Sequence, residues 1–594
     1  MNTRFENATT ARSSAILAPL CATLLGGWAA AALAQPDAGT LLNQEQRSHQ
    51  RLPDRLPEPE AEPVRPALKE QPGGVRVVVR SVRFTGAQGL AEDAELQAVV
   101  ADAIGRELDF AGLEKLAQRV TEFLRAKGWF LAEAYLPRQD VTDGNIEIAV
   151  RPGRLGGGSG KGEPFVVVLG GKLAPRIEAE RLEAIAAGLL PPGAAAREPD
   201  MERAVLLMND LPGVTARARL EPGAEAGSTR VVFDAEEGPL LTGSVSLDNY
   251  GNRDTGLYQA NAAAQLNDPT GLGDQASVAA TQADGLDLAR LSYTLPVGSN
   301  GTKLGASWTV MDYAIKRGAG LAAGLKGSSE TAGLTLSHPF LRSRADNIYG
   351  SLAFNRKALL DDSSAGPLHD KRVNATNAAV SGDHLDTKAG GGLTSWNLAW
   401  TEGRVDLSRL PDDADADAAT YATQGRYTKF NYGIARLQKL PGPFALFLNF
   451  AGQEAGKNLD SSEKFLLGGP TGVRAYPGSE ASGDSGWLAN IELRYDLPGG
   501  TPLGPLQLVA FYDAGRIVLH KDTKNIPVAT WSRQNAYDLA GWGFGANLVR
   551  TGSHALRLAW AQKIGDNPGR STAGLDADNR KDKSRVWLQA TLWF

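Results

Sequence analysis

From residue 241 to the C-terminus, the sequence is a succession of segments in which apolar and polar residues alternate. Alternation with a period of two is typical of β-strands whose two faces meet different surroundings. We count sixteen such segments, which begin near residues 241, 256, 274, 286, 302, 328, 347, 369, 390, 425, 444, 486, 506, 536, 554 and 585. An even number of antiparallel strands can close on itself and leave no free edge. The sequence therefore predicts a closed antiparallel barrel of about 16 strands over residues 239–594.

The last segment, residues 585–594, indicates what surrounds this barrel. One of its faces carries only apolar side chains: Val586, Leu588, Ala590, Leu592 and Phe594. Short turns such as 267–271 alternate with long polar connections such as 566–584 along the barrel region. Both features are typical of outer-membrane barrels. They favour a membrane β-barrel over a large soluble all-β domain.

Residues 1–34 predict a cleaved signal peptide. Two arginines precede an apolar run over 15–33, and Ala32-Leu33-Ala34 supplies the small residues of a cleavage site. We prefer this interpretation to a membrane anchor and to a lipoprotein signal ending at Cys21. Because Cys21 is the only cysteine, the mature chain would contain no disulfide and no thiolate site. No later run is apolar enough for a spanning helix, so the strands would have to cross the membrane.

The sequence offers no catalytic constellation. Its 62 basic and 67 acidic residues give a net charge of -5, which leaves no electrostatic footprint for nucleic acid. The six histidines are scattered without metal-ligand spacing, and the acidic run at 412–415 is typical of a solvated face rather than a calcium site. The glycine-rich stretch 156–162 lacks the spacing of a phosphate-binding loop. We therefore expect no enzyme activity, no cofactor and no metal.

Two small α+β units precede the barrel. In residues 75–155 we expect a strand, two helices and two further strands, at 75–84, 91–104, 110–127, 130–136 and 145–150. Residues 163–238 repeat this β-α-α-β-β order with a diverged sequence. The chain thus predicts two consecutive domains of the same plan.

A polar segment and a linker separate the signal peptide from the first unit. Residues 35–52 favour a helix, but the segment has too little apolar surface to hold a helix alone, so it must dock elsewhere or stay disordered. Residues 53–74 contain six prolines and predict an extended, solvated linker.

Several ordered motifs resemble those of one family. The segment Gly468-Gly469-Pro470-Thr471-Gly472-Val473-Arg474-Ala475-Tyr476 is followed by Gly483-Asp484-Ser485-Gly486-Trp487 and by Glu492-Leu493-Arg494-Tyr495. Further matching stretches lie at 131–140, 144–150, 207–214, 247–252 and 336–340. With these motifs, nearly the whole chain resembles the transporter component of two-partner secretion systems. This is the hemolysin/filamentous-hemagglutinin secretion-activation family of the Omp85 superfamily.

The resemblance implies an architecture and a function. The two small units correspond to POTRA domains in the periplasm of a Gram-negative bacterium, and the helix within 35–52 can plug the barrel. Such a protein recognises an unfolded exoprotein, hemolysin-like or adhesin-like, and secretes it across the outer membrane. Its other implied partners are outer-membrane lipid and the barrel assembly machinery, which would read Leu592 and Phe594 of the C-terminal strand.

Two alternative functions are weaker. An Omp85-type insertase, which assembles other outer-membrane proteins, tends to carry more POTRA domains than the two for which this chain has room. A passive porin lacks periplasmic domains altogether.

The family also implies a loop, here 458–486, that folds back into the barrel lumen. Its anchor would comprise Val473, Arg474 and Tyr476. The alternation over 506–515 turns the apolar side chains to lipid and Asp513 inward, so Arg474 and Asp513 can form a bidentate pair. The family's usual tetrad is Val-Arg-Gly-Tyr, and this chain has Ala475 in place of the glycine. If that backbone requires a positive φ, Ala475 carries strain.

Overall fold

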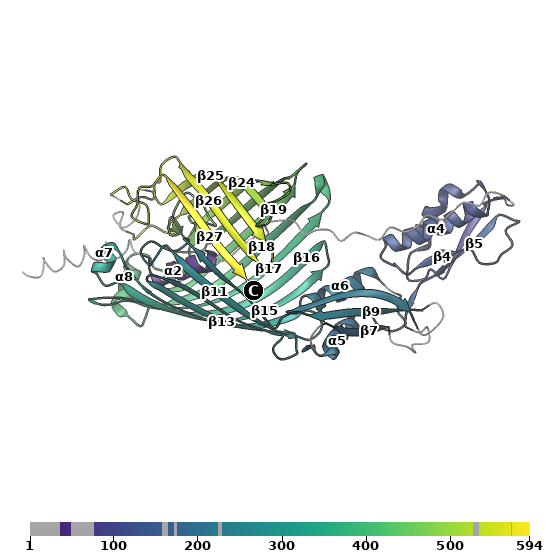
Figure 1. The fold of residues 1–594 in the computed structure, drawn as a ribbon, viewed down its shortest axis with the longest axis horizontal. Coiled ribbons are helices and arrows are strands. Elements are labelled where there is room, and N and C mark those ends of the chain that lie inside the picture. The colour runs from purple at the N-terminus through teal and green to yellow at the C-terminus, as the bar shows by residue number, and fades with distance from the viewer. Residues whose placement is uncertain are drawn as a thin grey trace, which may run out of the picture.

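The structure is a computed structural model that describes residues 36–48, 76–156, 164–171, 175–195, 197–223, 228–526, 534–571 and 573–594. The predicted signal peptide, the linker 53–74 and most of the glycine-rich stretch 156–162 lie outside the described residues. Figure 1 shows a barrel, a small domain against one end of it, and a second small domain farther out.

Sixteen antiparallel strands close the barrel, which confirms the predicted number. Each begins within three residues of its predicted start. The strands are β10 (Leu241–Asp248), β11 (Gln259–Asn267), β12 (Gln275–Ala283), β13 (Leu286–Val297), β14 (Thr302–Ala314), β15 (Lys326–Arg342), β16 (Asp346–Ser363), β17 (Gly366–Asp386), β18 (Gly392–Asp406), β19 (Gly425–Lys439), β20 (Phe444–Ala455), β23 (Ser485–Asp496), β24 (Leu506–Val518), β25 (Ala536–Arg550), β26 (His554–Ile564) and β27 (Ser584–Trp593).

The strands present apolar side chains outward and polar ones inward. In β24, Leu508 and Tyr512 are each 44% exposed on the outer surface, whereas Asp513 is fully buried inside. In β27, Val586, Leu588 and Leu592 are likewise exposed. A period of two produces this division because successive side chains point to opposite faces of the sheet.

The two ends of the barrel sequence meet at β10 and β27. Five residue pairs join these strands, from Ser244–Trp593 to Asp248–Gln589. Beyond them, Gly243 and Phe594 exchange backbone hydrogen bonds of 2.9 and 3.0 Å. The side chain of Asn249 accepts a hydrogen bond from the Leu588 N–H and donates one to the Val586 carbonyl. The junction is therefore extended at both ends by contacts outside the ladder.

Among the described residues, four short helices lie in connections between barrel strands: α7 (Gly318–Ala322), η2 (Lys388–Gly390), α8 (Pro411–Ala419) and η3 (Ser461–Glu463). Helix α8 contains the acidic run at 412–415, and Asp412 and Asp415 are exposed on it. None of the helices in the described residues is both long and apolar enough to cross a bilayer.

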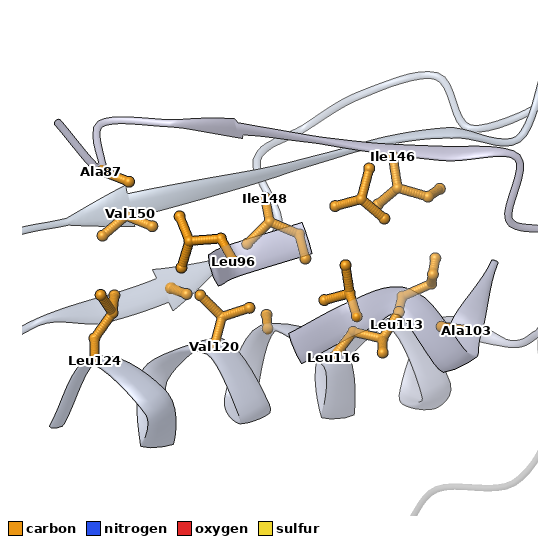
Figure 2. Close-up of a cluster of buried hydrophobic side chains, with 14 of the residues drawn as sticks. Ala87, Leu96, Ala103, Leu113, Leu116, Val120, Leu124, Ile146, Ile148 and Val150 are labelled. Carbon is orange, nitrogen blue, oxygen red and sulfur yellow. The ribbon is translucent and has the colours of Figure 1, made fainter. Parts of the chain in front are cut away.

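The outer small domain comprises β1 (Val77–Val78), β2 (Ser81–Thr85), α3 (Asp93–Val100), η1 (Ala101–Ala103), β3 (Glu107–Leu108), α4 (Phe110–Ala126), β4 (Glu133–Tyr135) and β5 (Asn145–Arg151). The predicted single strand at 75–84 is wrong, because β1 pairs with β3 while β2 pairs with β5. Strand β4 is also shorter than expected. Leu113, Leu116 and Val120 of α4 pack against the sheet, as Figure 2 shows.

The small domain next to the barrel comprises β6 (Arg154–Leu155), β7 (Phe165–Gly170), α5 (Ala179–Leu189), α6 (Glu198–Asn209), β8 (Val214–Pro222) and β9 (Ser228–Glu237). Its core lies between the two helices and the sheet. Asp210, just after α6, accepts hydrogen bonds of 2.9 and 2.8 Å from Arg342 of β15. The Lys303 ammonium donates to the Asp210 carbonyl at 2.7 Å. These contacts attach the domain to the end of the barrel.

Candidate functional site in the barrel lumen

The connection between β20 and β23 enters the barrel instead of remaining outside it. It contains η3 (Ser461–Glu463) and a two-stranded hairpin of β21 (Phe465–Leu466) and β22 (Ser482–Gly483). Leu467, Val473 and Tyr476 are fully buried there. We call residues 458–486 the lumen loop.

Arg474 joins the lumen loop to the barrel wall. Its Nε and Nη2 donate to the two oxygens of Asp513 at 2.8 and 2.7 Å, and its Nη1 donates to Glu492 Oε1 at 2.7 Å. The guanidinium carbon lies 3.5 Å from the ring centroid of Phe511. Burial disfavours the charge, but the Asp513 and Glu492 carboxylates outweigh it and raise the pKa of Arg474. The structure thus brings the two predicted residues together in bidentate geometry.

Four further residues complete this contact, and sequence reasoning did not assign them a role. Glu492 also pairs with Arg494 at 2.8 Å. Asn490 donates to Asp513 Oδ1 at 2.8 Å and to the Gly472 carbonyl at 3.1 Å. Trp587 of β27 donates to the Arg474 carbonyl at 2.7 Å. The alternation of β23 already places Glu492 and Arg494 on the inner face, and this signal could have identified them.

The condition for strain at Ala475, a positive φ, is not met. Among the described residues, the non-glycine positions with positive φ are Asp268, Ala389, Ala422, Ala481 and Asn579. Ala475 is fully buried against Gly541, where an added Cβ would lie 2.6 Å from the Ala475 Cβ. The methyl group at position 475 is therefore accommodated by a glycine on the barrel wall.

The other predicted anchor residues pack within the same cluster. The Val473 N–H donates to the Leu467 carbonyl at 2.8 Å, which tightens the turn before Arg474. The Lys563 ammonium lies 4.9 Å from the ring centroid of Tyr476. The predicted assembly-signal residues lie elsewhere: Leu592 and Phe594 are 64% and 63% exposed on the outer surface of the barrel.

Helix α2 (Ala38–Ser48) lies inside the barrel beside the lumen loop (Figure 1). Leu41 and Leu42 are 1% exposed, within an apolar cluster contributed by barrel strands and by Leu459 of the lumen loop. Gly39 lies directly against η3, since an added Cβ would approach Ser461 Oγ to 2.4 Å. The helix and the lumen loop therefore form one packed unit.

Charged side chains fix the start of α2 and η3 to the barrel wall. Lys371 of β17 donates to Asp37 at 3.2 Å and to Asp460 at 2.9 Å. Glu463 accepts ion pairs from Lys357 at 2.7 Å and from Lys429 at 2.8 Å. Burial opposes ionisation of Glu463, but the two ammonium groups outweigh it and lower its pKa to about 2. Both segments are therefore held chiefly by ionic contacts at these points.

A polar cavity of about 960 Å³ remains beside these segments. It is lined by residues of α2, of the lumen loop and of the inner barrel face, including Arg47, Thr471 and Asn397. In the part of the chain that the structure describes, there is no group of three or more His, Cys, Asp or Glu side chains that could hold a metal ion. The lumen therefore contains α2 and the lumen loop, and a cavity remains beside them.

Comparison with known proteins gives a family. A family model described as "Haemolysin secretion/activation protein ShlB/FhaC/HecB" matches residues 227–548, more than half of the 594-residue chain. A second, "POTRA domain, ShlB-type", matches residues 77–153.

Curated and solved relatives span most of the chain. It is 27% identical over 497 residues to the heme/hemopexin transporter protein HuxB of Haemophilus influenzae strain Rd, covering 83% of each chain. It is 23% identical over 548 residues to the outer membrane transporter CdiB of Escherichia coli, covering 90% of this chain and 88% of the relative. A solved structure, CdiB from Escherichia coli, has the same fold with a TM-score of 0.68 and 19% identity, covering 89% of this chain and 93% of that one.

These matches show where each part of the molecule lies relative to the outer membrane. The barrel lies in the outer membrane, the POTRA domains lie in the periplasm, and the family's members are transporters. The chain belongs to the haemolysin secretion/activation family, the outer-membrane transporters of two-partner secretion.

Proposed function

We propose that this transporter binds an unfolded, hemolysin-like or adhesin-like exoprotein with its POTRA domains and passes it through the barrel lumen. The observation that carries the proposal is the content of the lumen. Helix α2 and the lumen loop occupy part of it, and both are attached to the wall by side-chain ion pairs such as Lys371–Asp37 and Lys357–Glu463. Such contacts can be exchanged for water or for a passing chain without unfolding the closed strand ladder.

The POTRA domains offer strand edges for capture. In the first domain β2 and β4 are the outer strands of the sheet, and in the second β7 and β8 border β9. An extended segment of an exoprotein can add to such an edge through main-chain hydrogen bonds, which are largely independent of sequence. This explains how an unfolded partner is held before it enters the barrel.

Removal of the gene distinguishes secretion from insertion. A strain without this chain is expected to keep its exoprotein in the periplasm and to retain its normal content of other outer-membrane barrels. Both are measured by fractionation and quantitative mass spectrometry. A general fall in outer-membrane barrels with normal export would instead support the Omp85-type insertase.

The C-terminal strand concerns a different partner. As the sequence predicts, the barrel assembly machinery would recognise the exposed Leu592 and Phe594 before these side chains face lipid.

Deleting residues 36–48 is expected to increase single-channel conductance in planar bilayers several-fold while leaving secretion largely intact. The deletion removes α2, whose buried Leu41 and Leu42 fill part of the lumen beside the 960 Å³ cavity. Gly39→Leu is a milder version, because its side chain would overlap Ser461 and Ser462 of the lumen loop. Unchanged conductance in both variants would contradict a plugging role for α2.

Docking of α2 is expected to depend on pH through Glu45. Burial is the main reason that the pKa of Glu45 rises from its ordinary 4.5 to about 7, and nearby Asp248 adds to the rise while a hydrogen bond from Gln259 opposes it. The docked helix therefore takes up a proton between these two values, and its docking weakens as pH rises through about 7.

Asp37 does not titrate in this window, because the Lys371 ammonium outweighs burial and lowers its pKa. Arg47, whose pKa burial lowers to about 10, also stays charged.

The channel should accordingly open more often at about pH 8 than at about pH 5.5. Glu45→Gln is the matched variant, since it keeps the shape and removes the titration. Equal pH dependence of Glu45→Gln and wild type in planar bilayers would assign the effect to another group.

A further inference from the structure

A further charged side chain, that of Glu480, leaves the lumen loop six residues after Arg474. Glu480 is only 2% exposed, and it lies two residues before β22. Its Oε1 accepts a hydrogen bond from Asn567 Nδ2 and its Oε2 accepts one from the Ala577 N–H, both at 2.8 Å. Both donors belong to the connection between β26 and β27, which we call the last extracellular connection (565–583).

That connection is itself folded around a buried acid. Asp576 is 2% exposed and accepts hydrogen bonds from Asn567 at 2.9 Å and from Arg570 at 3.3 Å, and it also pairs with Lys563. Asn567 thus uses its two amide protons on Asp576 and Glu480 at once. Glu480 is bound to an ordered unit rather than to a loose loop.

The same connection reaches across the barrel junction. The Asp578 carbonyl accepts a hydrogen bond of 2.9 Å from Arg253, which lies in the connection between β10 and β11. The Asp578 carboxylate pairs with Arg585 of β27 at 2.7 Å. Lumen loop, last extracellular connection and first extracellular connection are therefore linked in one continuous set of polar contacts.

The residue after Glu480 has a strained backbone conformation. Ala481 has φ 56°, in the left-handed region that residues with a Cβ seldom adopt. Such a conformation persists only where surrounding contacts fix it. Here the Leu467 N–H donates to the Ala481 carbonyl at 3.2 Å, and the Gly468 N–H donates to the Glu480 carbonyl at 3.1 Å. The Glu480 side chain fixes the same turn from the other side.

We propose that Glu480 is a further positioning residue of the lumen loop, which ties the loop to the last extracellular connection and couples its withdrawal to opening of the extracellular exit. Arg474 holds the turn of the loop to β23 and β24, and Glu480 holds the stretch after that turn to the last extracellular connection. An exoprotein that displaces the lumen loop must then also loosen the connection at 565–583. The secretory consequence rests on the proposed function, whereas the tether itself does not.

Thiol labelling tests the tether without any exoprotein. The only natural cysteine is Cys21 in the predicted signal peptide, so an introduced cysteine reports alone. Ala577→Cys keeps the donating N–H and is half-buried. In whole cells, its labelling by a membrane-impermeant maleimide is expected to become about tenfold faster when Glu480→Ala is added. Glu480→Gln, which retains one acceptor oxygen, should give an intermediate rate.

Two controls separate the tether from a general loss of structure. Glu402→Ala removes an exposed acid of β18 and should leave the labelling rate unchanged. Ala414→Cys on α8, also half-buried, should label at one rate with or without Glu480→Ala. Equal labelling of Ala577→Cys in the Glu480→Ala and wild-type backgrounds, or an equal increase at both cysteines, would overturn the proposal. Loss of export with unchanged labelling would count against the tether and leave the secretion function standing.

Discussion

Replacing Arg474 with alanine is expected to reduce secretion more than tenfold while the barrel still assembles. The substitution leaves Asp513 and Glu492 facing each other without their shared cation. Breaking a buried pair in this way costs about 3–5 kcal/mol, and water in the lumen lowers that figure to a few kcal/mol. The loop loses its anchor, whereas β23 and β24 remain paired through their backbone ladder. Exoprotein in the medium and heat-modifiability of the barrel on a gel measure the two effects.

Related substitutions test the geometry of this anchor. Arg474→Lys should rescue poorly, because one ammonium cannot reproduce a planar fork that binds two carboxylates and covers the Phe511 ring. A charge swap between positions 474 and 513 would place an acid beside Glu492. A double-mutant cycle of Arg474→Ala and Asp513→Ala is therefore the cleaner test of this ion pair. We expect the double variant to be no worse than Arg474→Ala. Wild-type secretion by both single variants would show that the contact does not anchor the loop.

Deleting residues 75–238 is expected to abolish secretion without preventing insertion of the barrel. The deletion removes both POTRA domains, and with them the edges of β2, β4, β7 and β8 that can capture an extended segment in the periplasm. The barrel carries its own closed ladder of sixteen strands, so it does not need the POTRA domains to hold its shape. Secretion and heat-modifiability are again the measurements.

A point variant separates capture from docking. Arg342→Ala keeps both POTRA domains but removes the bidentate contact to Asp210 that attaches the second domain to β15. This contact is partly exposed, so its loss should weaken export only modestly. Normal export by the variant that lacks residues 75–238 would contradict capture of the exoprotein by the POTRA domains. A total loss of export with Arg342→Ala would indicate that secretion depends on docking of the second domain against the barrel.

Much of the barrel could be predicted because lipid and lumen impose opposite demands on alternate residues. The number of strands and the inward direction of Asp513 follow from that alternation, as do the exposed Val586 and Leu588 of β27. To predict the contact between Arg474 and Asp513, one must also know that the loop folds into the lumen. The resemblance supplied it, and the structure places the two side chains together.

The remaining contacts could not be predicted, because they join residues that only the closed barrel brings together. Asp37 and Lys371 lie 334 residues apart, and Glu480 and Asn567 lie 87 apart. Nothing in their local sequence indicates a partner. Strain at Ala475 would have required a positive φ there, but its backbone avoids positive φ, and Ala481 adopts that conformation instead. Similarly, the run at 75–84 reads as one strand, but β1 and β2 join different sheets.

The route of the exoprotein is the central claim, and site-specific photo-crosslinking tests it most directly. Asn397 and Leu398 are neighbours on β18, with Asn397 lining the lumen cavity and Leu398 46% exposed on the outer face. A photoreactive amino acid at each position, activated during secretion, should crosslink the exoprotein from 397 and only lipid or other membrane components from 398. Crosslinks to the exoprotein from 398 and none from 397 would contradict passage through the lumen.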